Sequence, residues 1–199
     1  MTTNHGRVCL LYQDSLHAVP VVTAEYQTFE HVAVFLYGQG VKSLFAVIYR
    51  PGSSPATSIV IHEFAEFVGQ FTRYSSLVIM GDVNIHLDIP TDPVTVNFLT
   101  LLSAHNLTQV VQSPTHTAGH LLDVIVQSNL AVSSVDVPPP VLSDHSMITA
   151  TLQLRRINHF EATFRSCRAW RSFNYHEFER DLQHSVLSIP LLLPLQNSY

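Results

Sequence analysis

Charge is scarce in this sequence, and lysine is the scarcest charged residue. Asp, Glu, Lys and Arg make up 13% of its 199 residues, Lys42 is the only lysine, and the formal net charge is −5. These values exclude a protein that binds nucleic acid through a broad basic face, because such binding depends on many Lys and Arg contacts to phosphate groups. A nuclease needs only a local groove, so that class of protein stays compatible with the composition.

Cysteine and long apolar runs are scarce as well. The two cysteines, Cys9 and Cys167, lie far apart in unlike contexts and do not indicate a disulfide framework. No apolar run reaches the ~20 residues needed to cross a membrane, and the first residues lack the apolar core of a signal peptide. We therefore expect a soluble, intracellular protein without a membrane partner. Its hydrophobic content of 46% is enough for a real core.

The most informative segment is VIMGDVNIH, at Val78–His86. The apolar run before Gly81 is long enough for one buried strand and too short for a helix. If the extended backbone continues, its period of two places Asp82, Asn84 and His86 on one face at the carboxyl end of the strand. An acid beside an amide at such an edge can hold a hard cation or an attacking water against a phosphate. The alternative is that these residues only form the turn after the strand.

Polar groups also stand at three other predicted strand ends. Asp123 lies in an otherwise apolar strand, where an unpaired carboxylate is costly to bury, so it needs a partner, and a His is a common one. A second polar cluster, Ser143–His145, precedes another strand-like run. Upstream, Tyr49 and Arg50 end a strand, and both side chains suit phosphate oxygens. Four polar strand ends together indicate a site.

The sequence at these four places resembles the endonuclease/exonuclease/phosphatase superfamily, most closely the endonuclease domain of non-LTR (LINE-type) retrotransposons. The matching segments stand in the family's order and roughly its spacing between Gly6 and about Leu154. They are YRP at Tyr49–Pro51, GDVNIHLD at Gly81–Asp88, PTHTAGHLLDVI at Pro114–Ile125 and LSDH at Leu142–His145. The resemblance implies an α/β fold with two packed β-sheets flanked by helices, a four-layer α/β-sandwich.

The resemblance also implies a role for each catalytic residue in metal-assisted hydrolysis of a phosphodiester. Asp82 would position or deprotonate the attacking water, and Asn84 would hold that water and a phosphate oxygen. His145, oriented by Asp123, would stabilise the charge that develops on the phosphoryl group. Tyr49 would donate a hydrogen bond to the phosphate.

The cofactor implied by the resemblance is Mg²⁺, with Mn²⁺ as the alternative ion. Asp144 would contribute to the metal site directly or through water, and Asp82 is the second expected ligand. An oxygen-rich site suits Mg²⁺ better than zinc. The expected partner is DNA as a transient substrate, and no small-molecule cofactor is expected.

Two elements of the family are missing from the sequence ahead of Gly6. One is a strand that carries a metal-associated Asn, and the other is a strand that ends in the Glu that is a principal metal ligand. The nearest acids, Glu25 and Glu30, do not stand in the family's context for that ligand. We therefore expect an amino-terminally truncated domain that lacks its first strands and is weak or inactive on its own.

Three functions stay open on the sequence alone. The first is an endonuclease that nicks DNA, and the second is a catalytically inactive remnant of a retroelement. The third is a phosphatase or phosphodiesterase of the same superfamily that acts on lipid or nucleotide phosphates. The basic segment after the last predicted strand favours the retroelement branch over the third.

The composition changes at about residue 154. Residues 1–154 are predicted to form the partial endonuclease domain, and residues 155–199 a basic, linker-like tail with one amphipathic helix over Phe173–Leu187. Within the domain, one helix is predicted from apolar spacing between Val60 and Phe71, and another from Asp92 as N-cap followed by a proline. Strands are predicted at Arg7–Tyr12, His17–Val22, His31–Tyr37, Ser43–Tyr49, Ser76–Met80, Thr108–Val111, Leu121–Gln127, Ala131–Val137 and Met147–Leu154.

Some histidines have a simpler interpretation than metal binding. His116 and His120 have the spacing of zinc ligands on a helix, but a nearby Pro and Gly argue for a loop, and no third ligand is evident. We expect His86 to anchor its loop rather than bind metal. Asp88 is expected to have a structural role and accept backbone N–H bonds.

Overall fold

The computed structural model describes residues 8–38, 41–71, 74, 76–153 and 174–185. These residues fall in two compact units, Met1–Asn158 and His159–Tyr199. In the second unit, α3 (Tyr175–Gln183) begins after Asn174, whose side chain accepts hydrogen bonds from two backbone N–H groups of the first turn. This helix lies within the predicted range Phe173–Leu187. The predicted boundary at residue 155 lies outside the described residues and stays a prediction.

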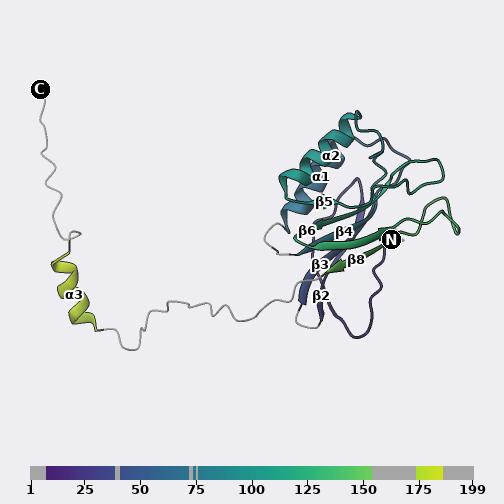
Figure 1. The fold of residues 1–199 in the computed structure, drawn as a ribbon. Coiled ribbons are helices and arrows are strands. Elements are labelled where there is room, and N and C mark those ends of the chain that lie inside the picture. The colour runs from purple at the N-terminus through teal and green to yellow at the C-terminus, as the bar shows by residue number, and fades with distance from the viewer. Residues whose placement is uncertain (1–7, 39–40, 72–73, 75, 154–173, 186–199) are drawn as a thin grey trace, which may run out of the picture. The chain divides into compact units, whose positions relative to one another are not determined.

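The first unit contains a six-stranded sheet with the strand order β1-β2-β3-β4-β6-β5 (Figure 1). Only β3 and β4 are parallel neighbours, and the other neighbouring pairs are antiparallel. A separate two-stranded sheet pairs β7 with β8. The strands are β1 (His17–Pro20), β2 (Glu30–Gly38), β3 (Val41–Tyr49), β4 (Leu77–Asp82), β5 (Thr108–Gln109), β6 (Asp123–Ser128), β7 (Ala131–Asp136) and β8 (Thr149–Gln153).

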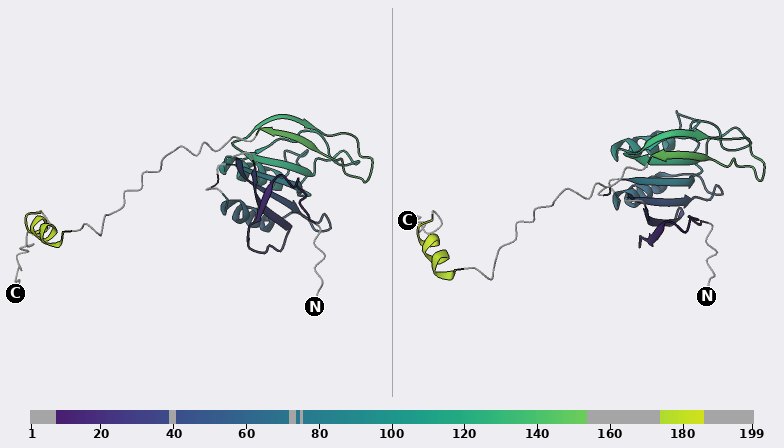
Figure 2. Two further views of the ribbon diagram at one scale, coloured as in Figure 1. Left: turned by 90° about the horizontal axis from the view of Figure 1, so that it is seen from below. Right: turned by 60° about the horizontal axis from the view of Figure 1, so that its bottom comes forward.

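Two helices pack on one face of the six-stranded sheet (Figures 1 and 2). They are α1 (Ser58–Gly69) and α2 (Pro93–Ala104). The N-cap predicted for α2 is confirmed, because the Asp92 carboxylate accepts hydrogen bonds from the backbone N–H groups of Val94 and Thr95. The buried phenylalanines of both helices contact the alternate residues of the strands that point to this side, and together they form the main core.

The opposite face of the large sheet packs against the two-stranded sheet. Val78 of β4 and Ile125 of β6 form a second core cluster with Val135 of β7 and Leu152 of β8. Two packed sheets flanked by helices are therefore confirmed. The described residues of this unit supply three layers: helices, large sheet and small sheet. No helix of the described residues is long and apolar enough to cross a membrane.

The predicted strand at Arg7–Tyr12 is wrong for the part that the structure describes. Residues 8–12 have no strand conformation. Leu11 is 93% exposed and Tyr12 is 48% exposed, so among the described residues no surface buries these two side chains. Apolar residues predict a strand only where a neighbouring strand and a core are available to pair with them.

Candidate active site

Three polar side chains predicted for the site lie in one row across the large sheet. Tyr49 of β3 pairs with Asp82 of β4, and Asp82 pairs with Asp123 of β6. Residues that pair directly point to the same face of a sheet. That face carries Val78 and the second core cluster, so the row lies beside the small sheet, at the end where β3 and β4 finish. The register alone therefore brings two carboxylates and a phenol together.

Gly81 allows β4 to reach this position. Its φ of 135° lies in the region that side chains rarely adopt. A Cβ atom at this residue would be 1.9 Å from the carbonyl oxygen of Ile48 on the neighbouring strand. No other residue type fits here, and the close strand approach places Asp82 at the strand end.

The extended backbone does not continue beyond Asp82, so the expected shared strand face of Asp82, Asn84 and His86 is wrong. Asn84 has a left-handed backbone with φ of 48°. The turn itself brings Asn84 back to the acid: its backbone N–H donates to Asp82 Oδ1 (2.9 Å) and its Nδ2 donates to Asp82 Oδ2 (2.7 Å). The predicted proximity of acid and amide thus comes from a turn, which was the alternative interpretation of this segment. His86 separates from them and contacts His120.

Arg50 is not available to a phosphate, contrary to the expectation from the sequence. Its side chain is 5% exposed. The guanidinium donates to the backbone carbonyls of Val83 (2.7 Å), Asn84 (2.6 Å) and Ser54 (2.8 Å). Burial lowers the pKa of Arg50, and the charge of Asp82 opposes this effect. Arg50 therefore fixes the turn that holds Asn84.

His145 reaches the row from the loop between β7 and β8. Its Nδ1 lies 2.8 Å from Asp123 Oδ2, the contact expected from the sequence. An ionised carboxylate only accepts hydrogen bonds, so Nδ1 carries the hydrogen and Nε2 is left for another partner. The loop is held by backbone pairing, because Ser146 N donates to Thr115 O (2.7 Å) and Thr117 N donates to Asp144 O (2.8 Å).

Thr115 is a positioning residue that the sequence did not single out. It is fully buried, and its Oγ1 accepts hydrogen bonds from the backbone N–H groups of Leu122 and Asp123, both at 3.1 Å. It therefore connects the start of β6 with the loop of His145. Apart from its place in a segment that resembles the family, nothing in the sequence indicates that this threonine positions other residues.

The electrostatics of the row shift two pKa values upward. Burial raises the pKa of Asp82, and the neighbouring charge of Asp123 adds to this, against the hydrogen bonds from Asn84 and the charge of His145. Burial alone would lower the pKa of His145. The hydrogen bond to Asp123 and the charges of Asp123, Asp82 and Asp144 outweigh burial and raise it above 6.5. Asp82 is thus a stronger base than an exposed carboxylate, and His145 keeps its proton more readily than an exposed imidazole.

The two expected metal ligands lie in neighbouring donor sets. Asp82, Asp123 and His145 offer ligand atoms within 4.8 Å of one another, and Asp144 does so with His116 and His145. Asp144 also lies 3.2 Å from His116 Nε2, and its side chain is 66% exposed. His145 belongs to both sets, but the structure does not bring Asp144 into the set of Asp82. Their joint role as ligands stays a prediction.

Glu30 stands in the same row as Asp82. It pairs with Tyr49, so it lies two strands from Asp82, about 10 Å between backbones at the usual strand spacing. Among the residues that the structure describes, no donor set with Asp82 contains a glutamate. The sequence-based expectation that Glu30 is not the family's metal ligand stays a prediction.

The contact between His145 and Asp123 predicts a raised pKa of His145, which can be measured on the protein in the presence of a chelator. We expect NMR titration of the His145 ring to give a pKa above 6.5, and a clearly lower value in Asp123→Asn, because the substitution removes both the hydrogen bond to a carboxylate and its charge. The raised pKa also implies that the stability contributed by this pair is full below ~6.5 and is lost as the pH rises through the folded pKa. An unchanged His145 pKa in Asp123→Asn would contradict the pairing.

Comparisons with known proteins agree with the fold. A family model described as "Endonuclease-reverse transcriptase" matches residues 43–149. The endonuclease domain of TRAS1, a telomere-specific non-LTR retrotransposon, superposes with a TM-score of 0.57 at 16% identity, over 73% of this chain and 70% of that one. The human Nocturnin catalytic domain with bound sulfate gives 0.57 at 19% identity, over 72% of this chain and 62% of that one.

An endonuclease/exonuclease/phosphatase protein from Bacteroides vulgatus gives a TM-score of 0.50 at 12% identity, over 70% of this chain and 65% of that one. No curated protein matches the sequence. At these identities the structural likenesses establish the fold, while the family model covers more than half of the chain. The chain therefore belongs to the endonuclease–reverse transcriptase family, within the endonuclease/exonuclease/phosphatase superfamily.

Proposed function

We propose that this chain carries the water-activating and phosphate-contacting part of a Mg²⁺-dependent site that hydrolyses phosphodiester bonds in DNA. The observation that supports it most is the row of Tyr49, Asp82 and Asp123 with His145 bonded to Asp123. In this proposal the arrangement supplies a base, a hydrogen-bond donor and a phenol at one end of the sheet. DNA is favoured as the substrate by the family model and by the fold likeness to a retrotransposon endonuclease.

Asp82 is the proposed base for the attacking water. Both of its oxygens are oriented by hydrogen bonds from Asn84, so the carboxylate cannot rotate freely. Its raised pKa increases its ability to accept a proton from the attacking water. Asn84 is itself fixed, because its Nδ2 also donates to Arg50 O (2.8 Å), so the pair is preorganised.

His145 is the proposed donor to the phosphoryl group. Asp123 fixes its orientation through Nδ1, and Nε2 can donate to a phosphoryl oxygen as negative charge develops there. The raised pKa of His145 increases the fraction that is protonated at neutral pH. Tyr49, next to Asp82 in the row, is the proposed second hydrogen-bond donor to the phosphate.

The donors around Asp82 fit a hard divalent cation. Carboxylates supply two of the three ligand atoms in the set of Asp82, Asp123 and His145, and burial together with Asp123 makes ionised Asp82 unfavourable without a compensating charge. We propose Asp82 and Asp144 as the residues that hold Mg²⁺, with Mn²⁺ as a substitute. The ion would supply Lewis-acid stabilisation of the phosphate oxygens.

The proposal is tested by adding the glutamate that the family resemblance implies. We expect the 199-residue chain to nick supercoiled plasmid in Mg²⁺ weakly or not at all, because no described donor set with Asp82 contains the glutamate that the family uses. Fusing the upstream segment of an intact relative ahead of Gly6 should restore nicking. Gel separation of supercoiled and open-circular plasmid measures it. A folded fusion protein without activity would argue against the proposal, and so would nicking by the chain alone at the rate of the fusion protein.

A further inference from the structure

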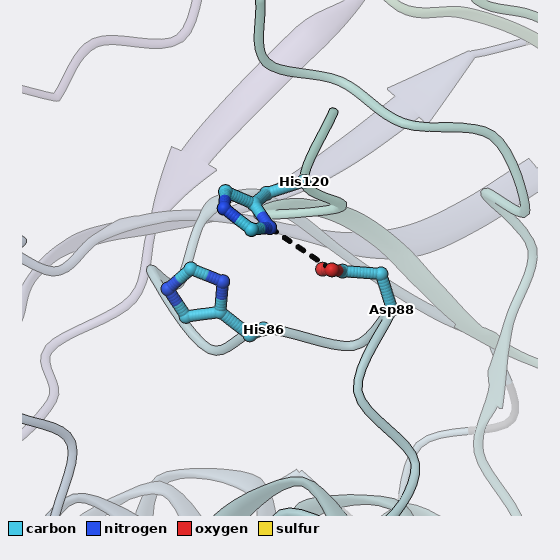
Figure 3. Close-up of side chains that lie close together, drawn as sticks. All are labelled: His86, Asp88 and His120. Atoms are coloured by element: carbon cyan, nitrogen blue, oxygen red, sulfur yellow. Dashed lines mark hydrogen bonds and ion pairs between the residues drawn. The ribbon is translucent and has the colours of Figure 1, made fainter. Parts of the chain in front are cut away.

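A second cluster of metal-ligating side chains lies beside the site but shares no residue with it. His86 and Asp88 come from the segment after β4, and His120 comes from the segment before β6. One ligand atom from each lies within 4.8 Å of the other two. Figure 3 shows the three side chains converging from the two segments, with a ring nitrogen of His86 turned toward His120 and Asp88.

His86 has a buried nitrogen that needs a partner. Its Nδ1 is buried, and among the described residues it has no hydrogen-bond partner. A buried polar atom without a partner is unfavourable and calls for an explanation. The imidazole is held in place by an edge-on contact with the His120 ring, at 4.3 Å between centroids and 84° between planes. A cation bound to Nδ1 would satisfy the atom that the protein leaves unsatisfied.

Asp88 supplies an oriented, anionic ligand. Its Oδ1 accepts from the backbone N–H of Leu121 (3.0 Å), and its Oδ2 lies 2.9 Å from His120 Nδ1. Burial acts to raise the pKa of Asp88, but the hydrogen bonds from His120 and Leu121 outweigh it and lower the pKa. The carboxylate is therefore ionised at neutral pH. The expected structural role of Asp88 as an acceptor of backbone N–H bonds is present and leaves Oδ2 facing the cluster.

We propose that His86, Asp88 and His120 form a zinc site. Two imidazoles with one carboxylate are ligands that Zn²⁺ prefers, whereas Mg²⁺ prefers oxygen alone. A tetrahedral Zn²⁺ with bonds of about 2.1 Å has its ligand atoms roughly 3.4 Å apart. The ligand atoms of the cluster lie within 4.8 Å of one another, and Asp88 Oδ2 lies 2.9 Å from His120 Nδ1, so only small side-chain movements are needed. The side chains of His120 and Asp88 are 36% and 26% exposed, which leaves the fourth position accessible to water.

The zinc site would connect the two segments that carry the catalytic residues. His86 and Asp88 follow Asn84 closely, and His120 precedes Asp123 by three positions. The segments are already joined by backbone hydrogen bonds from Leu87 N to Leu121 O (3.1 Å) and from Val83 N to Leu122 O (3.1 Å). An ion at this place would therefore be structural and would stabilise the separation of Asp82 and Asp123. This inference stands whether or not the chain is a nuclease.

The simpler interpretation is an ion pair of Asp88 and His120 that joins the segments without metal. Under that interpretation His86 has no part in the pairing. The His86→Leu variant therefore distinguishes a zinc site from a metal-free ion pair. The substitution removes the unsatisfied nitrogen and keeps the apolar contact with the His120 ring, so the metal-free variant should be at least as stable as the original chain. His116→Asn is the matched control, because His116 belongs to the donor set of Asp144.

The test is a Zn²⁺ titration of the full chain in competition with a chromogenic chelator, followed by Co²⁺ substitution. We expect one Zn²⁺ per chain, a Co²⁺ spectrum with tetrahedral visible bands, and no displacement by millimolar Mg²⁺. His86→Leu and His120→Gln should weaken the affinity at least about tenfold, and His116→Asn should leave it unchanged. Equal affinity in His86→Leu, loss of binding in His116→Asn, or no Zn²⁺ binding by the original chain would each overturn the site. Should His86→Leu fail to fold, the comparison of His120→Gln with His116→Asn decides the question.

Discussion

Asp82→Asn should abolish the nicking activity of the fusion protein with a restored upstream segment, lowering the rate by about 10²–10⁴-fold. The amide cannot accept the proton of the attacking water and is a poorer metal ligand, but it has nearly the same shape as the carboxylate. One oxygen remains to accept the hydrogen bond from Asn84 N, and the bond from Asn84 Nδ2 to the second oxygen is lost. The loss should therefore appear in the single-turnover rate of plasmid nicking, while circular dichroism reports an unchanged fold.

Stability should change in the opposite direction to activity. Because the folded pKa of Asp82 is raised above its unfolded value, the stability it contributes is present at low pH and is lost as the pH rises through the folded pKa. At neutral pH in chelator, Asp82→Asn should therefore unfold at the same urea concentration as the parent protein or at a higher one. A substitution that lowered activity only by unfolding the protein would lower this midpoint.

Asp136→Asn is the matched control for Asp82→Asn. Asp136 also ends a strand, β7, and is exposed, but it lies outside the row of Tyr49, Asp82 and Asp123. We expect its nicking rate to stay within about twofold of the parent, since exposed substitutions away from special features have small effects. Equal losses in the two variants would mean that Asp82 has no special part in the reaction.

The contact of Asp123 with His145 could be predicted because a buried carboxylate has few ways to be satisfied. A lone acid in an apolar strand needs a partner, and the family resemblance indicated that this partner is His145 of the segment LSDH. The N-cap at Asp92 was predictable for a similar reason, since the cap depends on residues next to it in the chain. In both cases a polar group had to be satisfied, which limited the partners that the sequence had to choose from.

The geometry of Asn84 and the role of Arg50 could not be predicted in this way. A pattern of alternating residues does not specify where a strand stops, and the left-handed turn at Asn84 depends on the neighbouring backbone of Arg50. An arginine before a proline carries no signal that separates phosphate binding from backbone binding. The proximity of the proposed zinc ligands could not be predicted either, because His120 is separated from His86 by 34 positions and from Asp88 by 32 positions of sequence.

Arg50→Met should destabilise the protein by about 3–5 kcal/mol, the cost typical of removing one partner from a buried, charged arrangement. The substitution leaves the carbonyl oxygens of Val83, Asn84 and Ser54 without their donor in a buried position. Stability of a single domain is commonly ~5–15 kcal/mol, so the substitution would remove a large share of the free energy of unfolding. Urea unfolding followed by far-ultraviolet circular dichroism measures the change in the free energy of unfolding.

Arg50→Lys gives the sharper comparison, because it keeps the charge. A lysine has one compact ammonium group and cannot reach the several carbonyls that the planar guanidinium bridges, so we expect a smaller but clear loss of about 2 kcal/mol or more. Arg180→Lys is the control: Arg180 lies in α3 with its side chain 66% exposed, and its substitution should change little. If Arg50 served to bind phosphate, Arg50→Lys would keep the unfolding midpoint and weaken only substrate binding. If the buried hydrogen bonds of Arg50 hold the turn of Asn84, Arg50→Lys should lower the midpoint of urea unfolding and disturb that turn.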